Sequence, residues 1–307
     1  MPEAVVEVRQ VSKSFDRRRP ILREVSFSLK RGEMVALIGA SGSGKSTLVR
    51  TIAGLVPIDK SVAGDDLGAA ATGEIVLFGQ LMQRRGRITR AAKRLRVRVG
   101  VVFQQFNLVP RLSVLTNVCL GLLGQMSFFR GTIGRFTAMD KRRAMQALAR
   151  VGIADHALKR GAELSGGQQQ RAAIARTLVQ RAELLIADEP IASLDPGAAR
   201  RVMDILADLN RSDRITVLVS LHQVEYALRY CPRTIALRSG EVVYDGPSSE
   251  LTSTLLTSIY GADNEELFAP SLEPADVTPA QSALAMMPGA LLGVVARFSQ
   301  SERIGAS

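Results

Sequence analysis

The segment from Gly39 to Ser46 has the composition of a phosphate-binding loop. It follows the apolar run Met34 to Ile38, which is typical of a buried strand, and it opens the helix-forming run Thr47 to Leu55. Closely spaced glycines let consecutive backbone N–H groups converge on phosphate oxygens. A lysine brings a cation to the outer phosphates, and a serine hydroxyl ligates Mg²⁺. The alternative is a glycine-rich turn before an ordinary helix. The residues predicted to bind a nucleotide here are Gly39, Ala40, Ser41, Gly42, Ser43, Gly44, Lys45, Ser46 and Thr47.

A second candidate for phosphate binding is the segment Leu164 to Arg171, Leu-Ser-Gly-Gly-Gln-Gln-Gln-Arg. Ser165 is a residue type that caps a helix N-terminus, and Gly166 and Gly167 leave backbone N–H groups exposed there. Such a helix start attracts an anion. A serine-capped surface helix without a ligand is the alternative.

Polar side chains also follow three apolar runs that are typical of buried parallel strands. Leu184 to Asp188 ends in a carboxylate and is followed at once by Glu189. At the carboxyl end of its strand, Asp188 is placed to hold Mg²⁺. Gln104 follows the run Val99 to Phe103, and His222 follows Thr216 to Ser220.

Taken in their order along the chain, these segments resemble the ATP-binding cassette (ABC) family. The resemblance implies that Asp188 holds Mg²⁺ through water and that Glu189 orients and deprotonates the attacking water. It also implies that His222 contacts the γ-phosphate. Gln104 would sense Mg²⁺ and the attacking water and link the site to a membrane partner, with Gln105 leaving that assignment open.

The same resemblance implies a site shared between two cassettes. The signature segment would contact the γ-phosphate of an ATP held by the other cassette, with Asp195 in the neighbouring D-loop. Ser165, Gly166, Gly167 and Gln168 stand at the signature positions.

Two further residues have competing interpretations. Phe15 stands where the family has an aromatic residue stacked on adenine, and a phenylalanine keeps the ring face needed for stacking. The alternative is a core phenylalanine that ends the strand Val5 to Val11. His156 lies in a charged helical stretch and is predicted to be a solvated side chain.

The resemblance implies an α/β fold, the P-loop NTPase ABC cassette. We expect a mainly parallel sheet core with an antiparallel β part and an inserted helical subdomain. The predicted cassette spans 4–248 with the helical subdomain at about 106–163; 249–261 ends the cassette, and 262–307 forms a poorly ordered tail rich in Pro, Ala, Ser and acidic groups. The insertion 61–72 is expected to be a surface loop. A hairpin is predicted from Thr234 to Asp245 around Ser239-Gly240.

Composition agrees with a single cytosolic module. The net charge is +11, with basic clusters at 17–19, 84–98 and 141–143. These clusters have three possible interpretations: attraction to an anionic membrane, attraction to nucleic acid, or simple solvation of helix faces.

Two distant cysteines are expected to be reduced thiols. The start has no pattern of a signal peptide, and no run reaches the roughly 20 apolar residues that cross a bilayer.

Finer resemblance favours one cargo. The stretches Ala187 to Asp195, Ser220 to Cys231, Val243 to Leu251 and Ile259 to Gly261 are similar to the phosphonate import ATP-binding family. Phe103 to Val109 also occurs in importers of polar amino acids, which remain the alternative. The resemblance covers about residues 5–261. It implies an ATPase with ATP and Mg²⁺ as cofactors, at the cytoplasmic face of the inner membrane.

The implied partners are a second copy of the chain, transmembrane permease subunits and, through the complex, a periplasmic solute-binding protein. No nucleic-acid partner is expected. One alternative is a nucleic-acid-linked ABC ATPase, but the tandem cassettes or long coiled-coil insertions typical of that class are absent from the sequence. The other is a regulatory cassette that does not hydrolyse ATP, which would lack Glu189 or His222, and both residues are present.

Overall fold

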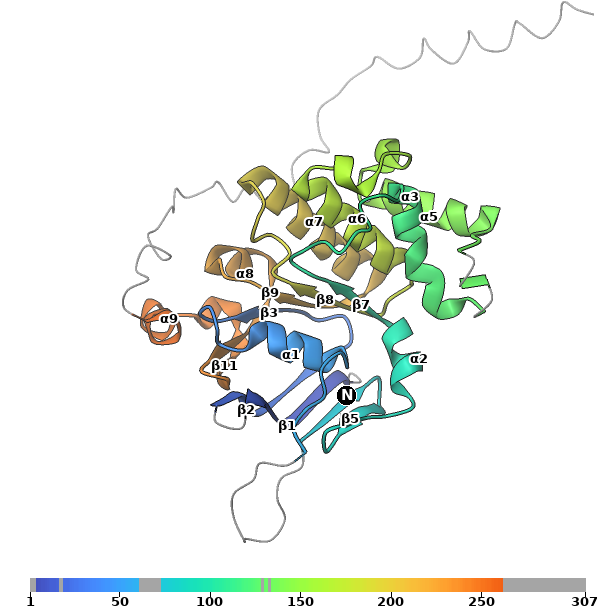
Figure 1. The fold of residues 1–307 in the computed structure, drawn as a ribbon. Coiled ribbons are helices and arrows are strands. Elements are labelled where there is room, and N and C mark those ends of the chain that lie inside the picture. The colour runs from blue at the N-terminus through green and yellow to red at the C-terminus, as the bar shows by residue number, and fades with distance from the viewer. Residues whose placement is uncertain (1–3, 17–18, 61–72, 128–129, 132–133, 262–307) are drawn as a thin grey trace, which may run out of the picture. The chain divides into compact units, whose positions relative to one another are not determined.

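The computed structural model describes residues 4–16, 19–60, 73–127, 130–131 and 134–261. The predicted surface loop at 61–72 and the predicted tail at 262–307 lie outside the described residues. All the described elements belong to one compact unit (Figure 1).

A six-stranded sheet forms the centre of this unit, in the order β11-β10-β3-β9-β8-β7. The bounds are β3 Met34–Ile38, β7 Val99–Val102, β8 Leu184–Asp188, β9 Thr216–Ser220, β10 Arg233–Arg238 and β11 Glu241–Pro247. Every pair is parallel except β10 and β11, which form the hairpin predicted from the sequence. β3, β8 and β9 are buried along their whole length, which explains their continuous apolar sequence.

A second, antiparallel sheet has the order β2-β1-β4-β5-β6. Its bounds are β1 Ala4–Asp16, β2 Arg19–Lys30, β4 Glu74–Leu77, β5 Gln80–Arg84 and β6 Arg87–Ile88. Helix α1, Lys45–Ile52, lies between the two sheets, and α2, Ala92–Val97, packs against β5 and β7 (Figure 1).

Two hydrophobic cores follow from the alternation of side chains along the central strands. In β3, Met34, Ala36 and Ile38 face the core shared with the helices α6, Gly166–Val179, and α7, Pro196–Asp213. Val35 and Leu37 face the core shared with α1 and the antiparallel sheet. The central sheet is therefore covered on both faces, as a parallel sheet requires.

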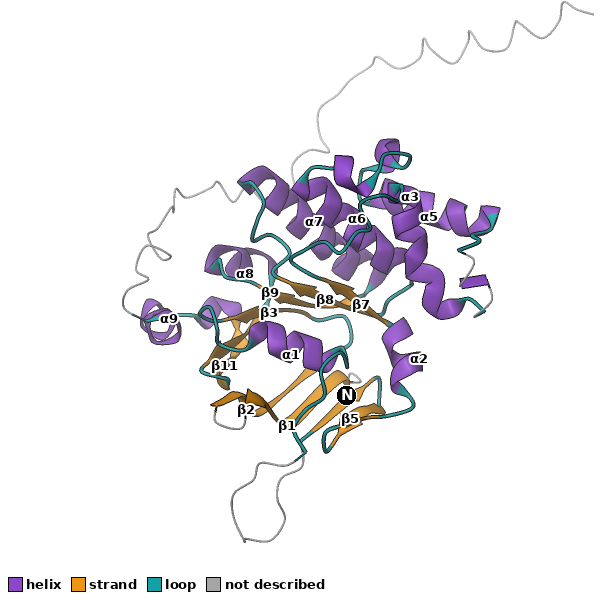
Figure 2. Cartoon of the chain, viewed as in Figure 1, coloured by secondary structure: helices purple, strands orange, loops and turns teal. Residues whose placement is uncertain are grey.

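Helices fill the chain between β7 and β8, as Figure 2 shows. They are α3 Val114–Cys119, the 3₁₀ segment η1 Leu120–Gln125, α5 Ala138–Arg150, and the short 3₁₀ segments η2 Ala154–His156 and η3 Gly161–Glu163, before α6. Thr137 and Asp140 form a capping box that fixes the start of α5.

After α7 the chain continues through β9, α8 Val224–Tyr230, the β10–β11 hairpin, η4 Ser248–Glu250 and α9 Ser253–Tyr260. α9 packs against β10. None of the helices in the described ranges has the length and apolar character that a membrane crossing demands.

Candidate nucleotide-binding and catalytic site

The loop between β3 and α1 has a backbone that only glycine accommodates at two points. Gly39 has φ 148° and Gly44 has φ 105°. A side chain at Gly39 would collide with the carbonyl oxygen of Leu237, and one at Gly44 would meet that of Ile21. Gly42, by contrast, faces open space, since a Cβ there would have no atom within 4 Å. The loop therefore packs closely against neighbouring backbone at Gly39 and Gly44 and is open at Gly42.

Lys45, the first residue of α1, turns its ammonium back onto this loop. Its Nζ donates to the carbonyl oxygens of Gly39 at 2.7 Å and Ala40 at 3.1 Å. Burial lowers the pKa of Lys45, and the nearby carboxylates of Glu189 and Asp188 oppose that shift. A buried cation held mainly by neutral carbonyls gains most from an anionic ligand. The Ser43 hydroxyl is also buried and has no hydrogen-bond partner among the described residues. Both features fit a polyphosphate.

Asp188 joins the phosphate loop to two neighbouring strands. Its Oδ1 accepts from the Ser46 hydroxyl at 3.1 Å and from the Ser220 hydroxyl at 2.9 Å. The Ser220 hydroxyl in turn accepts from the backbone N–H of Glu189 at 2.8 Å. Ser220 is fully buried at the end of β9, directly beside Asp188 in the β8–β9 register. The strand order therefore holds Ser46 and Asp188 together, although 142 positions separate them.

This pair of oxygen donors fits Mg²⁺. A hydroxyl and a carboxylate are ligands of the type that Mg²⁺ accepts, and the ion commonly keeps water and substrate phosphates as its other ligands. Within the described ranges, no group of three or more His, Cys, Asp or Glu side chains could hold a metal ion by itself. Few protein ligands are needed where the nucleotide supplies the rest.

Glu189 and His222 meet at the same edge of the sheet. Nε2 of His222 lies 2.6 Å from Oε1 of Glu189. Glu189 has φ 51°, in the left-handed region that non-glycine residues rarely adopt. The two side chains border a small cleft of about 140 Å³, which Ile191, Ala192, Ser220, Leu221 and Gln223 also line. The unusual backbone at Glu189 thus aims its carboxylate at the histidine.

The predicted signature residues form the capped start of α6. The Ser165 hydroxyl accepts from the N–H of Gln168 at 3.4 Å, and the Gln168 side chain accepts from the N–H of Ser165 at 2.9 Å. A Cβ on Gly167 would crowd Ala198 at 2.9 Å, so α6 and α7 approach closely there. Across the described residues, no hydrogen bond joins this helix start to the phosphate loop of the same chain.

His156 is not the solvated side chain that the sequence predicted. Its Nε2 lies 2.8 Å from Nε2 of Gln168, and its side chain is only 19% exposed. The prediction was wrong because η2 turns back toward the start of α6, a tertiary contact that a charged local sequence does not reveal.

Three other predicted residues are exposed. Asp195 caps α7 by accepting from the N–H of Ala198 at 2.9 Å, and this backbone hydrogen bond lowers the pKa of its carboxyl. Gln104 and Gln105 lie in the loop after β7, and neither side chain is hydrogen-bonded to the Asp188 cluster in the described structure. Among the predicted metal ligands, a hydrogen bond joins Ser46 and Asp188, and none joins either of them to Gln104 in the described structure.

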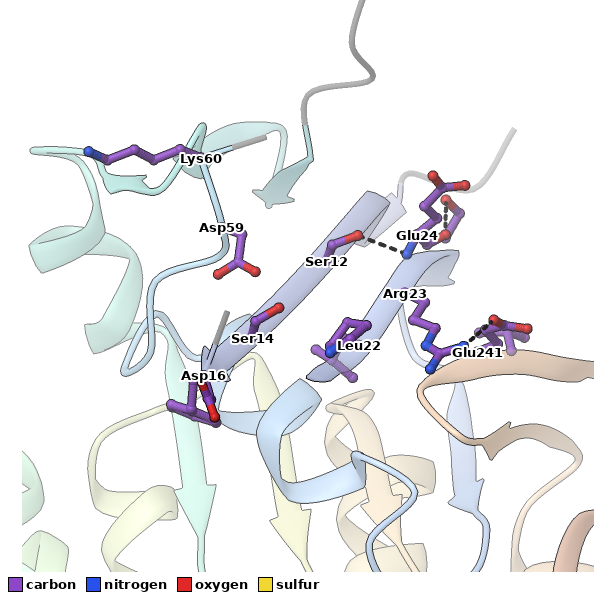
Figure 3. Close-up of a pocket in the computed structure, with 13 residues that line it drawn as sticks. Ser12, Ser14, Asp16, Leu22, Arg23, Glu24, Asp59, Lys60 and Glu241 are labelled. Carbon is purple, nitrogen blue, oxygen red and sulfur yellow. Dashed lines mark hydrogen bonds and ion pairs between the residues drawn. The ribbon is translucent and has the colours of Figure 1, made fainter. Parts of the chain in front are cut away.

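Phe15 is 65% exposed near the end of β1, so its alternative interpretation as a core residue is wrong. The Lys13 ammonium lies 5.2 Å from the centre of its ring. Phe15 lines an open groove of about 1450 Å³ between β1, β2 and the segment at Asp59 and Lys60 (Figure 3). This groove does not include the cluster around Asp188, which the smaller cleft borders.

Two residues that the sequence analysis did not single out also belong to the site. Ser220 connects Asp188 to Glu189 by hydrogen bonds. The feature of the sequence that could have identified it is a polar residue at the carboxyl end of an apolar strand. Tyr260, at the end of α9, hydrogen-bonds to the backbone of both Gly39 and His222. The segment Ile259 to Gly261 carries part of the family resemblance, but no local pattern indicates a contact with the nucleotide site, because Gly39 and His222 are distant in sequence.

Comparison with known proteins agrees with this geometry. The family model described as ABC transporter matches residues 22–192. The phosphonates import ATP-binding protein PhnC 1 of Pseudomonas aeruginosa is 54% identical over 262 residues, covering 85% of this chain and 91% of the relative. A protein of the same name from Cupriavidus metallidurans is 52% identical over 270 residues, covering 88% and 92% of the two chains.

A solved structure, a dimeric post-hydrolysis state of the ATP-binding cassette MJ0796 bound to ADP and Pi, is also similar. It is 31% identical, with a TM-score of 0.66, and the match covers 79% of this chain and 98% of that one. The parallel sheet and the loop before α1 define a P-loop nucleotide-binding domain with the predicted α/β cassette fold. The chain belongs to the ABC transporter family, and its ABC domain binds ATP.

Proposed function

We propose that this chain is the ATP-hydrolysing subunit of an ABC import complex that takes up phosphonates. The observation that carries the ATPase assignment is the Glu189–His222 contact of 2.6 Å beside the Ser46–Asp188 pair. The cargo assignment is supported by relatives that are named phosphonates import ATP-binding proteins and match most of the chain.

The nucleotide is held by the loop from Gly39 to Thr47 and the start of α1. Backbone N–H groups at the open middle of this loop bind phosphate oxygens, and the helix start adds its partial positive charge. Lys45 exchanges its loop carbonyls for phosphate oxygens, which relieves its desolvation. Phe15 offers an exposed ring face for stacking on adenine.

Ser46 and Asp188, which are hydrogen-bonded to each other, would hold Mg²⁺ directly or through water, and the exposed Gln104 in the loop after β7 would complete the protein ligands. When bound, Mg²⁺ supplies neutralisation of the charge that develops on the transferred phosphoryl group. The hydroxyl of Ser220 donates to the Asp188 carboxylate and accepts a hydrogen bond from the backbone N–H of Glu189. Ser220 therefore links the position of Asp188, the proposed Mg²⁺ ligand, to that of Glu189, the proposed base.

Hydrolysis is in-line attack of water on the γ-phosphorus. Glu189 accepts a proton from the attacking water, and its carboxylate is aimed by the left-handed backbone and by His222. His222, from the end of the adjacent strand, also contacts the γ-phosphate. Positioning and electrostatic stabilisation provide most of the acceleration in phosphoryl transfer.

Two copies of the chain form two complete sites. At the start of α6, the exposed Ser165 and the partly buried Gly166, Gly167 and Gln168 bind the γ-phosphate held by the other copy, with Asp195 alongside. The dimeric state in the name of the similar MJ0796 structure supports this arrangement. The dimer works at the cytoplasmic face of the membrane with permease subunits and a periplasmic solute-binding protein, and no nucleic acid takes part.

A growth experiment tests the cargo. A strain lacking this chain is expected to stop growing on an alkylphosphonate as sole phosphorus source while growing normally on phosphate. The intact chain restores growth, and Lys45→Ala does not. Unimpaired growth on the phosphonate with reduced uptake of a polar amino acid would overturn the cargo and leave the ATPase assignment standing.

A further inference from the structure

The hydroxyl of Tyr260 lies between the phosphate loop and the segment that carries His222. The backbone N–H of Gly39 donates to Oη at 3.3 Å, and Oη lies 3.3 Å from the carbonyl oxygen of His222, to which it donates. A phenolic hydroxyl has one proton and can accept while it donates, so one atom serves both partners. The Tyr260 side chain is buried, with 6% of the residue exposed.

The fold brings Tyr260 to this place from the last described helix. Thr252 caps the start of α9, and the helix ends at Tyr260, followed by Gly261 with φ 87° as its C-cap. The Arg238 guanidinium on β10 donates to the carbonyl of Ser258 at 3.0 Å and so holds the last turn. β3 and β9 are neighbouring parallel strands, so the residues that follow them, Gly39 and His222, lie at one edge of the sheet.

The hydroxyl is also kept in its protonated form. Burial raises the pKa of Tyr260 to about 12, with the Gly39 N–H acting in the opposite direction. At neutral pH the group is therefore a neutral donor to His222 and carries no negative charge toward the phosphate loop. A phenolate here would repel the nucleotide phosphates and could not donate.

We propose that Tyr260 is a positioning residue for hydrolysis, which fixes the His222 backbone relative to the phosphate loop. The His222 side chain contacts Glu189 at 2.6 Å, so the bridge sets where the Glu189–His222 pair lies over the phosphates. The inference rests on the proposed function, because it concerns the same site. It assigns a role in turnover to Tyr260, which lies at the end of the cassette and outside the phosphate loop, the signature and the polar residues that follow the central strands.

The first test is Tyr260→Phe in the full chain, with kcat expressed per nucleotide-binding site. The ring still fills its space, but the Gly39 N–H and the His222 carbonyl lose their shared partner. We expect kcat to fall roughly fivefold, because the two lost hydrogen bonds are both long, at 3.3 Å, and together should contribute about as much as one ordinary neutral hydrogen bond. KM for ATP should change by less than about twofold. Tyr230→Phe is the matched control, since its hydroxyl donates to Asp204 at 2.8 Å on α7, and it should leave both constants unchanged.

The second test asks whether Tyr260 acts through His222. In a His222→Ala background, Tyr260→Phe should cause no further loss of residual turnover. An equal fivefold loss in both backgrounds would mean a general structural role and would overturn the inference. So would an unchanged kcat in the single variant, or a raised KM with kcat intact. If the His222→Ala background turns over too slowly to measure, the kcat and KM of the single variant decide.

These outcomes differ from failure of the proposed function itself. In that case the intact chain would not hydrolyse ATP, or Glu189→Gln would turn over at the normal rate. A lower Tm of Tyr260→Phe without the expected loss of kcat would also contradict the positioning role, because it would show that Tyr260 contributes to folding alone.

Discussion

The imidazole of His222 and the carboxylate of Glu189 approach to 2.6 Å, although 33 positions separate the two residues in the sequence. Each follows the carboxyl end of its own strand, and β8 and β9 are adjacent and parallel. Neighbouring parallel strands present such residues at one edge of the sheet. The contact is therefore a consequence of strand order, and it places a proton acceptor beside the cleft in which we propose that water attacks.

Ser220 is predicted to be required for turnover, although it touches neither nucleotide nor water in the proposed mechanism. Ser220→Ala leaves the part-buried N–H of Glu189 without its serine partner and removes the buried hydrogen bond that Asp188 accepts from Ser220. We expect kcat to fall roughly tenfold, because a lost partner in a buried network costs about 1–3 kcal/mol. Steady-state ATPase kinetics at several Mg²⁺ concentrations would measure it.

The control for Ser220→Ala is Ser248→Ala. Ser248, in η4, is another buried serine, and its hydroxyl lies 2.7 Å from the Thr234 hydroxyl on β10. Ser248→Ala should lose stability without a selective loss of kcat. Equal kinetic effects of the two substitutions would contradict the role of Ser220.

If two copies of the chain share each site as proposed, two inactive variants should complement each other. Ser165→Arg places a bulky cation at the exposed start of α6, and Lys45→Ala removes the cation of the phosphate loop. Neither variant should hydrolyse ATP alone, but a mixture contains dimers with one intact site. We expect about a quarter of the normal activity from an equal mixture, assuming random pairing and independent sites. Normal activity of the Ser165→Arg chain alone would rule out this use of the signature.

Much of the site could be predicted from sequence because the phosphate loop, the signature and the polar residues after apolar strands are local patterns. The fold class followed from the family resemblance that these segments carry, and the continuous apolar runs of β3, β8 and β9 are confirmed as buried strands. The β10–β11 hairpin is confirmed as well.

What the sequence did not reveal depends on contacts between distant elements. His156 contacts Gln168 only because η2 folds back onto the start of α6. Tyr260 reaches Gly39 across 221 positions, and Phe15 is exposed because β1 continues to Asp16 at the rim of the groove. The roles of Gln104 and Asp195 remain predictions, since each lies exposed in the described chain.

Stability is expected to respond to pH through Glu183, which precedes β8. Hydrogen bonds from Arg98, and then from Arg31, lower the pKa of the Glu183 carboxyl. A lowered carboxyl pKa stabilises the fold above the unfolded-state pKa of about 4.3, and this contribution is lost as the pH falls through the folded-state value. Glu183→Gln should therefore lower Tm at pH 7 and have a smaller effect at acidic pH.

The effect of Glu183→Gln should be modest, on the order of 0.5 kcal/mol, because the side chain is 37% exposed and solvent screens the ion pair. Thermal unfolding at pH 7 and at acidic pH measures it, with Glu225→Gln on the exposed side of α8 as the control. A loss of Tm that does not depend on pH would show that the ion pair is not its source.

The central claim is that Glu189 accepts the proton of the attacking water. ATP turnover and ATP binding, measured together with Mg²⁺ for Glu189→Gln and Lys45→Ala, test it most directly. Glu189→Gln should bind ATP normally and hydrolyse it roughly 100-fold more slowly, since an amide holds water but cannot take its proton, whereas Lys45→Ala should lose binding. Near-normal turnover in Glu189→Gln would contradict the account.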